Sequence, residues 1–175
     1  MYNRIILVLC VISIVLGGLF SCALIRHNRQ ITKNAIELSE IENMPELKAL
    51  AINGSEINLN ERLSPEKRTV ILFFSPDCEF CQQEIKGIIS RYSECRNVQW
   101  VFFTLAQPED ISAFSDEYHI HDIPDSYIIR EEWPGLYNKL NIKAPPELFI
   151  YDEHGKLMVH HKGATSIKTI VEELQ

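Results

Sequence analysis

The sequence has little positive charge, and what it has is unevenly placed. Lysine and arginine number 17 against 24 aspartates and glutamates in 175 residues, a formal net charge of −7. Residues 1–33 hold four of the basic residues and no acidic one, so the rest of the chain carries 13 basic residues, 24 acidic residues and a charge of −11. Nucleic-acid binding depends on neutralising phosphates with lysine and arginine. The acidic domain is therefore a poor candidate for binding nucleic acid, and we expect no nucleic-acid partner.

The spacing of the cysteines argues against a metal centre. Of the five cysteines, Cys78 and Cys81 are spaced as CxxC. A structural zinc site needs four ligands, but Cys95 and the six histidines form no second paired motif. We therefore expect no metal and no cofactor. A static disulfide between Cys78 and Cys81 is an alternative, although a bridge closing so short a loop adds little stability.

One long stretch lacks charge altogether. Residues 5–25 are an uncharged run bounded by Arg4 and Arg26, long enough to cross a bilayer as a helix. A second interpretation is a cleaved signal, because residues 19–22 (LFSC) loosely resemble the lipobox of bacterial lipoproteins, with Cys22 as the lipidated residue. Both interpretations predict attachment to a membrane. Basic residues after the run outnumber Arg4, which by itself favours a cytoplasmic C-terminal side, so orientation stays open.

The remaining chain predicts a linker and one α/β domain. We assign residues 1–26 to the anchor or signal segment, 27–46 to a stalk and 47–175 to the domain. Hydrophobic patterning in the domain predicts strands and helices in alternation. The expected strands are 47–51, 56–59, 69–74, 98–105, 126–130, 148–151 and 156–161, and the expected helices 79–92, 108–118, 133–140 and 166–174. Strand–helix alternation predicts a parallel core flanked by helices, with hairpins adding antiparallel strands.

The CxxC pair lies where a buried strand gives way to a helix. Cys78 falls at the helix N-terminus, where free backbone N–H groups and the helix dipole stabilise a thiolate. Cys81 lies one turn further on the same face, close enough to attack a mixed disulfide at Cys78. This placement predicts Cys78 as the exposed nucleophile and Cys81 as the buried resolving thiol.

Residues 73–81 (FFSPDCEFC) resemble the active-site segment of the thioredoxin superfamily. More narrowly, the chain is similar to the membrane-anchored TlpA-like thiol–disulfide oxidoreductases, from about residue 44 to the C-terminus, including residues 146–156 (PELFIYDEHGK). The resemblance implies a thioredoxin-like fold with a central mixed sheet and an N-terminal hairpin. It also implies that Pro146 is a cis proline that packs beside the cysteines and, with Pro145, contacts substrate.

Three positions depart from the family pattern. Leu72 stands where cytoplasmic thioredoxin has a buried acid, so no proton acceptor for Cys81 is visible unless Glu79 folds inward. Pro145 has no N–H, which removes one main-chain contact to substrate. Asp77 replaces the usual aromatic residue, so that Asp77, Glu79 and Glu84 are expected to put negative charge around Cys78 and oppose the helix dipole.

Two other classes of protein fit less well. A peroxiredoxin needs a proline where Ile71 stands, seven residues before the reactive cysteine. A copper-binding metallochaperone of the Sco-like type spaces its cysteines as CxxxC and adds a distant histidine, which His160 or His161 would have to supply. A thioredoxin fold used only as a binding module would not need the intact cysteine pair.

The sequence therefore predicts a thiol–disulfide oxidoreductase whose partners are protein thiols and disulfides. We expect it to act as a reductant on the outer, periplasmic or extracytoplasmic, side of a membrane. We further expect a membrane electron donor to supply its electrons.

Overall fold

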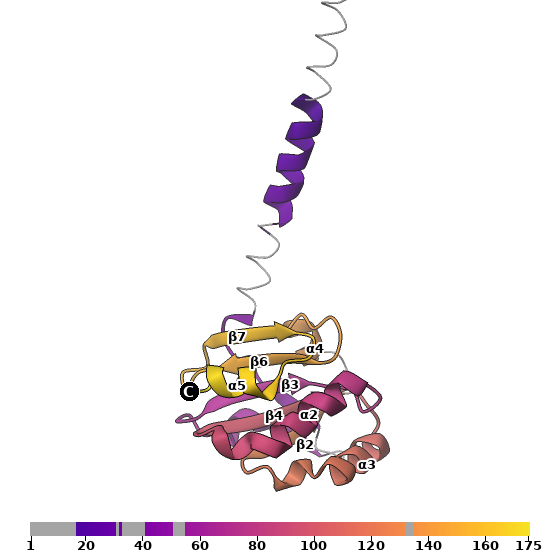
Figure 1. Cartoon of the computed structure of the whole chain (residues 1–175), viewed down its shortest axis with the longest axis vertical. Coiled ribbons are helices and arrows are strands. Elements are labelled where there is room, and N and C mark those ends of the chain that lie inside the picture. The colour runs from indigo at the N-terminus through magenta and orange to yellow at the C-terminus, as the bar shows by residue number, and fades with distance from the viewer. Residues whose placement is uncertain (1–16, 31, 33–40, 51–54, 132–134) are drawn as a thin grey trace, which may run out of the picture. The chain divides into compact units, whose positions relative to one another are not determined.

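The computed structural model describes residues 17–30, 32, 41–50, 55–131 and 135–175 (Figure 1). The chain divides into two units, Met1–Ser39 and Glu40–Gln175. In the first unit, residues 17–30 are helical. The predicted membrane segment, residues 5–25, lies partly outside the described residues. Within the described part of the chain, no helix is long and apolar enough to span a membrane.

The second unit is built on a mixed sheet, which has seven strands in the described residues, in the order β2-β1-β5-β4-β3-β6-β7. The central strands β3, β4 and β5 are parallel, β1 and β2 add antiparallel strands beyond β5, and β6 and β7 do so beyond β3. The strands are β1 Lys48–Leu50, β2 Glu56–Asn58, β3 Arg68–Phe73, β4 Val98–Thr104, β5 Ser126–Arg130, β6 Glu147–Tyr151 and β7 Leu157–Lys162.

Within the described residues of this unit, four α-helices connect or follow the strands. They are α2 Glu79–Arg91, α3 Pro108–Tyr118, α4 Gly135–Lys139 and α5 Ile167–Glu173, with 3₁₀ turns at Leu59–Glu61, Tyr92–Glu94 and Ile120–Asp122. Each helix and strand lies within about two residues of its expected bounds. The pairing of β1 with β2 confirms the predicted N-terminal hairpin. Its expected Asn53-Gly54 turn lies outside the described residues, as does the start of the helix expected at 133–140.

Strand β3 and the residue after it bury side chains on both faces of the sheet, as their continuous apolar sequence requires. Val70, Leu72 and Phe74 pack with α2, α3 and α5. Ile71 and Phe73 point to the other face, where they pack with α4 and the segment that precedes β1. Successive side chains of a strand alternate between faces, so one strand links both apolar clusters and holds α2 against the sheet.

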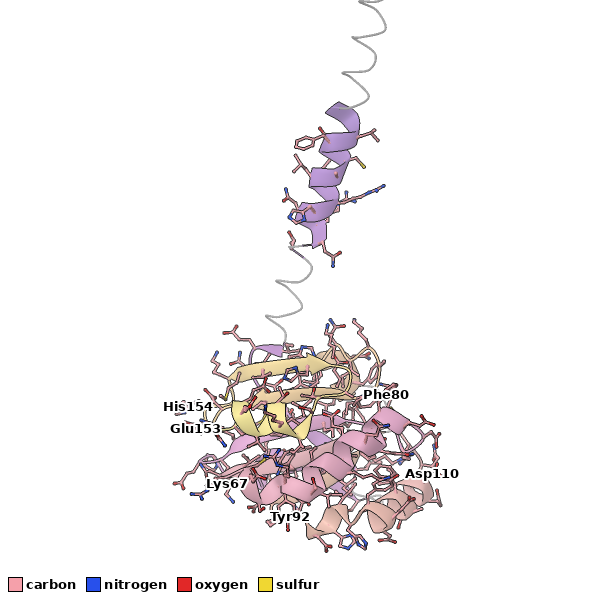
Figure 2. All side chains as sticks on the ribbon, viewed as in Figure 1. Lys67, Phe80, Tyr92, Asp110, Glu153 and His154 are labelled. Atoms are coloured by element: carbon pink, nitrogen blue, oxygen red, sulfur yellow. The ribbon has the colours of Figure 1, made fainter. Side chains whose placement is uncertain are left out.

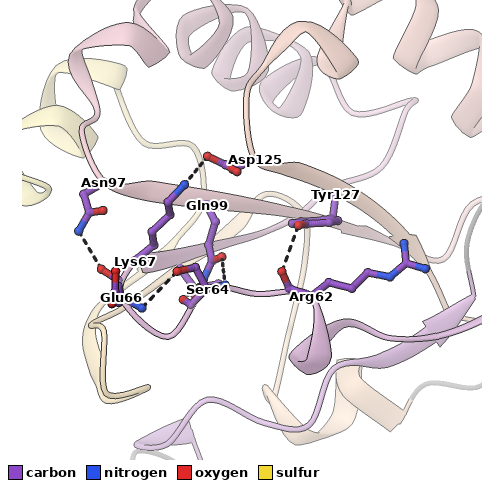
Figure 3. A network of polar contacts seen from close by, with 9 residues as sticks. Arg62, Ser64, Glu66, Lys67, Asn97, Gln99, Asp125 and Tyr127 are labelled. Atoms are coloured by element: carbon purple, nitrogen blue, oxygen red, sulfur yellow. Dashed lines mark hydrogen bonds and ion pairs between the residues drawn. The ribbon is translucent and has the colours of Figure 1, made fainter.

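A polar network secures the start of β3 at the end of the sheet away from the cysteines (Figure 3). The buried amide of Gln99 accepts a hydrogen bond from Ser64 N at 2.9 Å and donates to Ser64 O and to Thr69 Oγ1. Lys67 Nζ lies 2.5 Å from Asp125 Oδ2. These contacts join the loop before β3 to β4 and to the residue before β5, and so fix where β3 begins.

Candidate active site

The cysteines lie at the abrupt transition from β3 to α2. Phe74 N still donates to Phe103 O of β4 at 2.9 Å, and the chain then turns through residues 75–77. Cys78 is the N-cap of α2, and its Sγ accepts a hydrogen bond from Cys81 N at 3.3 Å. A cap acceptor satisfies one of the free N–H groups at a helix start. The sulfur of Cys78 therefore has the position that the sequence predicts, with negative charge on it favoured by the N-terminus of α2.

Cys81 lies one turn below, fully buried among Ile85 and Ile88. Burial raises the pKa of its thiol, and the neighbouring Cys78 raises it further. Both cysteines are free thiols. Cys78 is thus partly exposed whereas Cys81 is buried with a raised pKa, which suits the roles of attacking and resolving thiol.

The peptide bond between Pro145 and Pro146 is cis, as expected from the resemblance, and Pro146 is buried. The carbonyl oxygen of Pro145 lies 3.7 Å from Cys78 Sγ and accepts a hydrogen bond from its thiol. Pro145 lacks an N–H group, so at this position the main chain offers the site a carbonyl oxygen alone. The Cys78 thiol has a hydrogen to donate to that oxygen, and a thiolate has none.

The loop carrying Pro145 is held by a buried carboxylate. Glu147, only 1% exposed, accepts a hydrogen bond from Lys143 N at 2.9 Å and pairs with His160 Nε2 at 2.8 Å. The ring of His160 also stacks on Phe149. A carboxylate with both oxygens engaged restrains the backbone on the N-terminal side of the two prolines.

The acidic residues expected around Cys78 differ in how far they are buried. Asp77 and Glu79 are exposed, so Glu79 does not fold inward to serve Cys81. Phe80, between the cysteines, is also exposed, at 63% (Figure 2). Leu72, at the position of the missing acid, is buried in the apolar cluster that contains Cys81. The two exposed carboxylates thus remain available to oppose charge on Cys78 from outside.

Glu84 does not join that exposed acidic group, so its expected role beside Cys78 is wrong. It is only 4% exposed, and burial raises its pKa to about 7. One oxygen accepts a hydrogen bond from Thr165 N at 3.2 Å. The other, Oε1, has no hydrogen-bond partner among the described residues. Glu84 follows Cys81 by three residues on the buried face of α2, and its charge affects the ionisation of that thiol.

A pattern in the sequence could have found Glu84. Residues three and four apart share one helix face, and the spacing that predicts Ile85 and Ile88 as buried also puts Glu84 beside Cys81. A buried carboxyl with a pKa near neutrality and a free oxygen is suited to accept and return a proton. Glu84 is thus a buried acid near Cys81, although it does not stand at the position of Leu72.

The two histidines of the alternative copper site are engaged with carboxylates. His160 pairs with Glu147, and His161 pairs with Glu173 at 2.9 Å, so each imidazole has a carboxylate partner. Within the described residues, the ligand atoms that lie close enough to hold a metal ion belong to three exposed side chains after α3: His119, His121 and Asp122.

Solved structures with this fold include several redox proteins. A secreted Mycobacterium tuberculosis disulfide oxidoreductase, homologous to E. coli DsbE, superposes with a TM-score of 0.62 at 16% identity, covering 78% of this chain and 96% of its own. StoA from Bacillus subtilis gives 0.59 at 16% identity, covering 77% and 99%. A mutant of peroxiredoxin 6 from Arenicola marina gives 0.65 at 16% identity, covering 77% and 70%. At such low identity the similarity establishes the fold. No curated protein matches the sequence significantly.

The sheet order, the strand-to-helix turn and the cis proline define a thioredoxin-fold protein with a CxxC dithiol site. Comparison of the sequence with models of protein families gives the same class. A family model for the thioredoxin-like domain matches residues 57–175, more than half of the chain, and the protein belongs to that family.

Alkylation of the reduced protein should distinguish the thiols of the domain. We expect Cys78 to react fastest, because Cys81 is inaccessible and burial raises the pKa of both Cys81 and Cys95. Each unit of raised pKa lowers the thiolate fraction about tenfold. Iodoacetamide labelling followed by peptide mass mapping measures the three rates separately. Equal rates for Cys78 and Cys81 would contradict the assignment of the nucleophile.

Replacing Glu84 by glutamine should change how stability depends on pH. The pKa of Glu84 rises from 4.5 to about 7 on folding, so the native state binds more protons between these values and stability falls as pH rises through them. At about pH 8 the full cost, about 3 kcal/mol, opposes folding. The Glu84→Gln variant should therefore be more stable than wild type there by a similar amount and show a flatter profile.

Urea unfolding between about pH 4 and pH 8 measures this difference. Glu79→Gln is the matched control, since Glu79 is exposed on the same helix and should leave the profile unchanged. If Glu84→Gln follows the wild-type profile, the carboxyl of Glu84 is not held near neutrality by burial.

Proposed function

We propose that this protein is a thiol–disulfide oxidoreductase that reduces disulfides in protein substrates. The observation that carries the proposal is the asymmetric pair at the start of α2: Cys78 partly exposed at the N-cap and Cys81 buried one turn below. Thiol–disulfide exchange needs an accessible thiolate and a second thiol positioned to attack it. A binding module or a static disulfide has no need for this asymmetry.

The reaction proceeds in two exchanges. The thiolate of Cys78 attacks a substrate disulfide, which gives a mixed disulfide and releases one substrate thiolate. Cys81 then loses its proton and attacks Cys78 Sγ, which releases the second substrate thiolate and leaves a Cys78–Cys81 disulfide. Two electrons pass to the substrate, whose thiolates take up two protons. An external dithiol donor must return two electrons to regenerate the pair.

Glu84 is the base that we assign to the second exchange. Deprotonation of Cys81 is the difficult step because burial raises the pKa of that thiol. Glu84 has a pKa of about 7 and an oxygen with no hydrogen-bond partner among the described residues. A base with a pKa near the working pH is the most effective proton acceptor. Burying Glu84 lowers the stability of the fold, and on this assignment the reaction needs that burial because it requires a base beside Cys81.

The charges around Cys78 favour the reducing direction. Asp77 and Glu79 are exposed acidic residues beside it, and the Pro145 carbonyl oxygen accepts a hydrogen bond from its thiol. Each disfavours a thiolate at Cys78, and a less stable thiolate makes a dithiol a stronger reductant. We therefore infer that the protein donates electrons, as TlpA-like reductants do.

The reduction potential tests both exchange and direction. Equilibration of the full chain with glutathione buffers, with thiol trapping and mass analysis, should give a value nearer thioredoxin's, about −270 mV, than the about −120 mV of DsbA. A Cys81→Ser control should stop as a glutathione mixed disulfide at Cys78. A potential above about −180 mV would reverse the inferred direction, and no mixed disulfide in the control would exclude exchange through Cys78.

The location of the domain forms part of the proposal. The uncharged residues 5–25, or a lipid on Cys22, would hold the domain on the outer side of a membrane, where a membrane donor supplies electrons. Intact-mass analysis of the membrane-extracted protein should show an unprocessed N-terminus or an acylated Cys22. A soluble, unmodified full-length protein in the cytosol would contradict both forms of anchoring.

A further inference from the structure

A cavity lies beside two neighbours of the reactive cysteine, Asp77 and Pro145. It has a volume of about 460 Å³ and is formed by the turn at residues 75–77, the end of β4 with the loop after it, the first turn of α3, Tyr137 and Pro145. Pro145 borders both this cavity and Cys78, because its carbonyl oxygen lies 3.7 Å from Cys78 Sγ. A polypeptide whose cysteine is bonded to Cys78 would therefore have neighbouring side chains within reach of the cavity.

The cavity has both apolar and polar walls, and the charged residues among them are acidic. Leu105, 38% exposed, and the ring of Tyr137 contribute apolar surface. The charged residues that line the cavity are Asp77 and Asp110, both exposed, with no lysine, arginine or histidine in the described lining. Arg130, close by, donates through Nε to the Ala106 carbonyl oxygen at 3.1 Å.

Helix dipoles do not cancel this negative charge. Asp77 and Asp110 lie at the N-terminal ends of α2 and α3, each of which carries about half a positive elementary charge. Two carboxylates exceed the two helix termini by about one unit of negative charge, which the single positive charge of Arg130 nearby offsets. Glu79 and Glu109, also in the first turns of these helices, leave the surroundings of the cavity negative. Figure 2 shows Asp110 at the surface of the domain.

We propose that this cavity binds the side chain of a lysine or arginine close in sequence to the reactive cysteine of the substrate. Such a side chain has a long aliphatic stem and a cationic end. The stem would pack on Leu105 and Tyr137 while the cation reaches Asp110, and the Tyr137 ring adds a cation–π contact. The acidic domain as a whole attracts basic polypeptides. This inference rests on the proposed function and names the substrate class.

Peptides of one length test the preference. Each carries one cysteine as a mixed disulfide with thionitrobenzoate, and lysine, leucine or glutamate stands two residues before or after it. The reduced full chain should react with the best lysine peptide at least about fivefold faster than with its glutamate counterpart, because one charge pair at contact distance in water has about that effect. Leucine peptides should fall between, and high salt should narrow the range.

Variants at Asp110 locate the effect. Asp110→Asn should lower the ratio of lysine to glutamate rates by about fivefold, and Asp110→Lys should reverse the preference. Asp116→Asn and Asp116→Lys are the matched controls, since Asp116 is exposed on the same helix but does not line the cavity. Circular dichroism checks that α3 survives the charge reversal at its first turn.

The outcomes separate the two proposals. An unchanged ratio in both Asp110 variants, or an equal change in the Asp116 variants, would overturn the cavity as a site for a cationic side chain. Leucine peptides that react fastest throughout would instead make it an apolar site and overturn the inference as well. If a Cys78→Ser variant consumed every peptide as fast as wild type, the exchange mechanism itself would fail.

Discussion

The burial of β3 on both faces is the constraint from which the site follows. Its alternating side chains enter two apolar clusters, so the strand has no freedom to shift along the sheet without exposing both sets. The chain must leave this strand at Phe74 and start α2 within a few residues. Cys78 therefore lies at a helix N-terminus, at the carboxyl edge of the parallel strands. The Pro145–Pro146 loop, which leads into the antiparallel neighbour β6, lies beside it.

The same packing buries Glu84, which lowers the stability of the fold. The buried face of α2 would be more stable with an apolar residue there, since a carboxyl removed from water either loses its charge or keeps it at a cost in free energy. Glu84 instead lies beside the resolving thiol, held by Thr165 N from the loop before α5. Buried titratable groups that weaken a fold are concentrated at sites of chemistry, and this one suits the proton that Cys81 must lose.

The second buried carboxylate, Glu147, has a different task. Its two oxygens are both engaged, by Lys143 N and by His160. It therefore acts as a structural brace for the loop that carries Pro145, whereas Glu84 keeps one oxygen without a described partner. A buried polar group whose hydrogen bonds are all made stiffens the structure around it. A carboxyl with one oxygen left unbonded can still accept a proton on that oxygen.

The sequence by itself determined the order and bounds of the strands and helices and the position of Cys78 and Cys81, because hydrophobic period and helix-start chemistry are local properties. Only the tertiary structure decided which acidic residue enters the core. Asp77, Glu79 and Glu84 look alike in a list of charges, yet Glu84 alone of these three is buried, on the inner face of α2 with Thr165 N bonded to it. The cavity beside Pro145 also depended on folding, because its walls come from β4, α3, α4 and the proline loop, which only the packed sheet brings together.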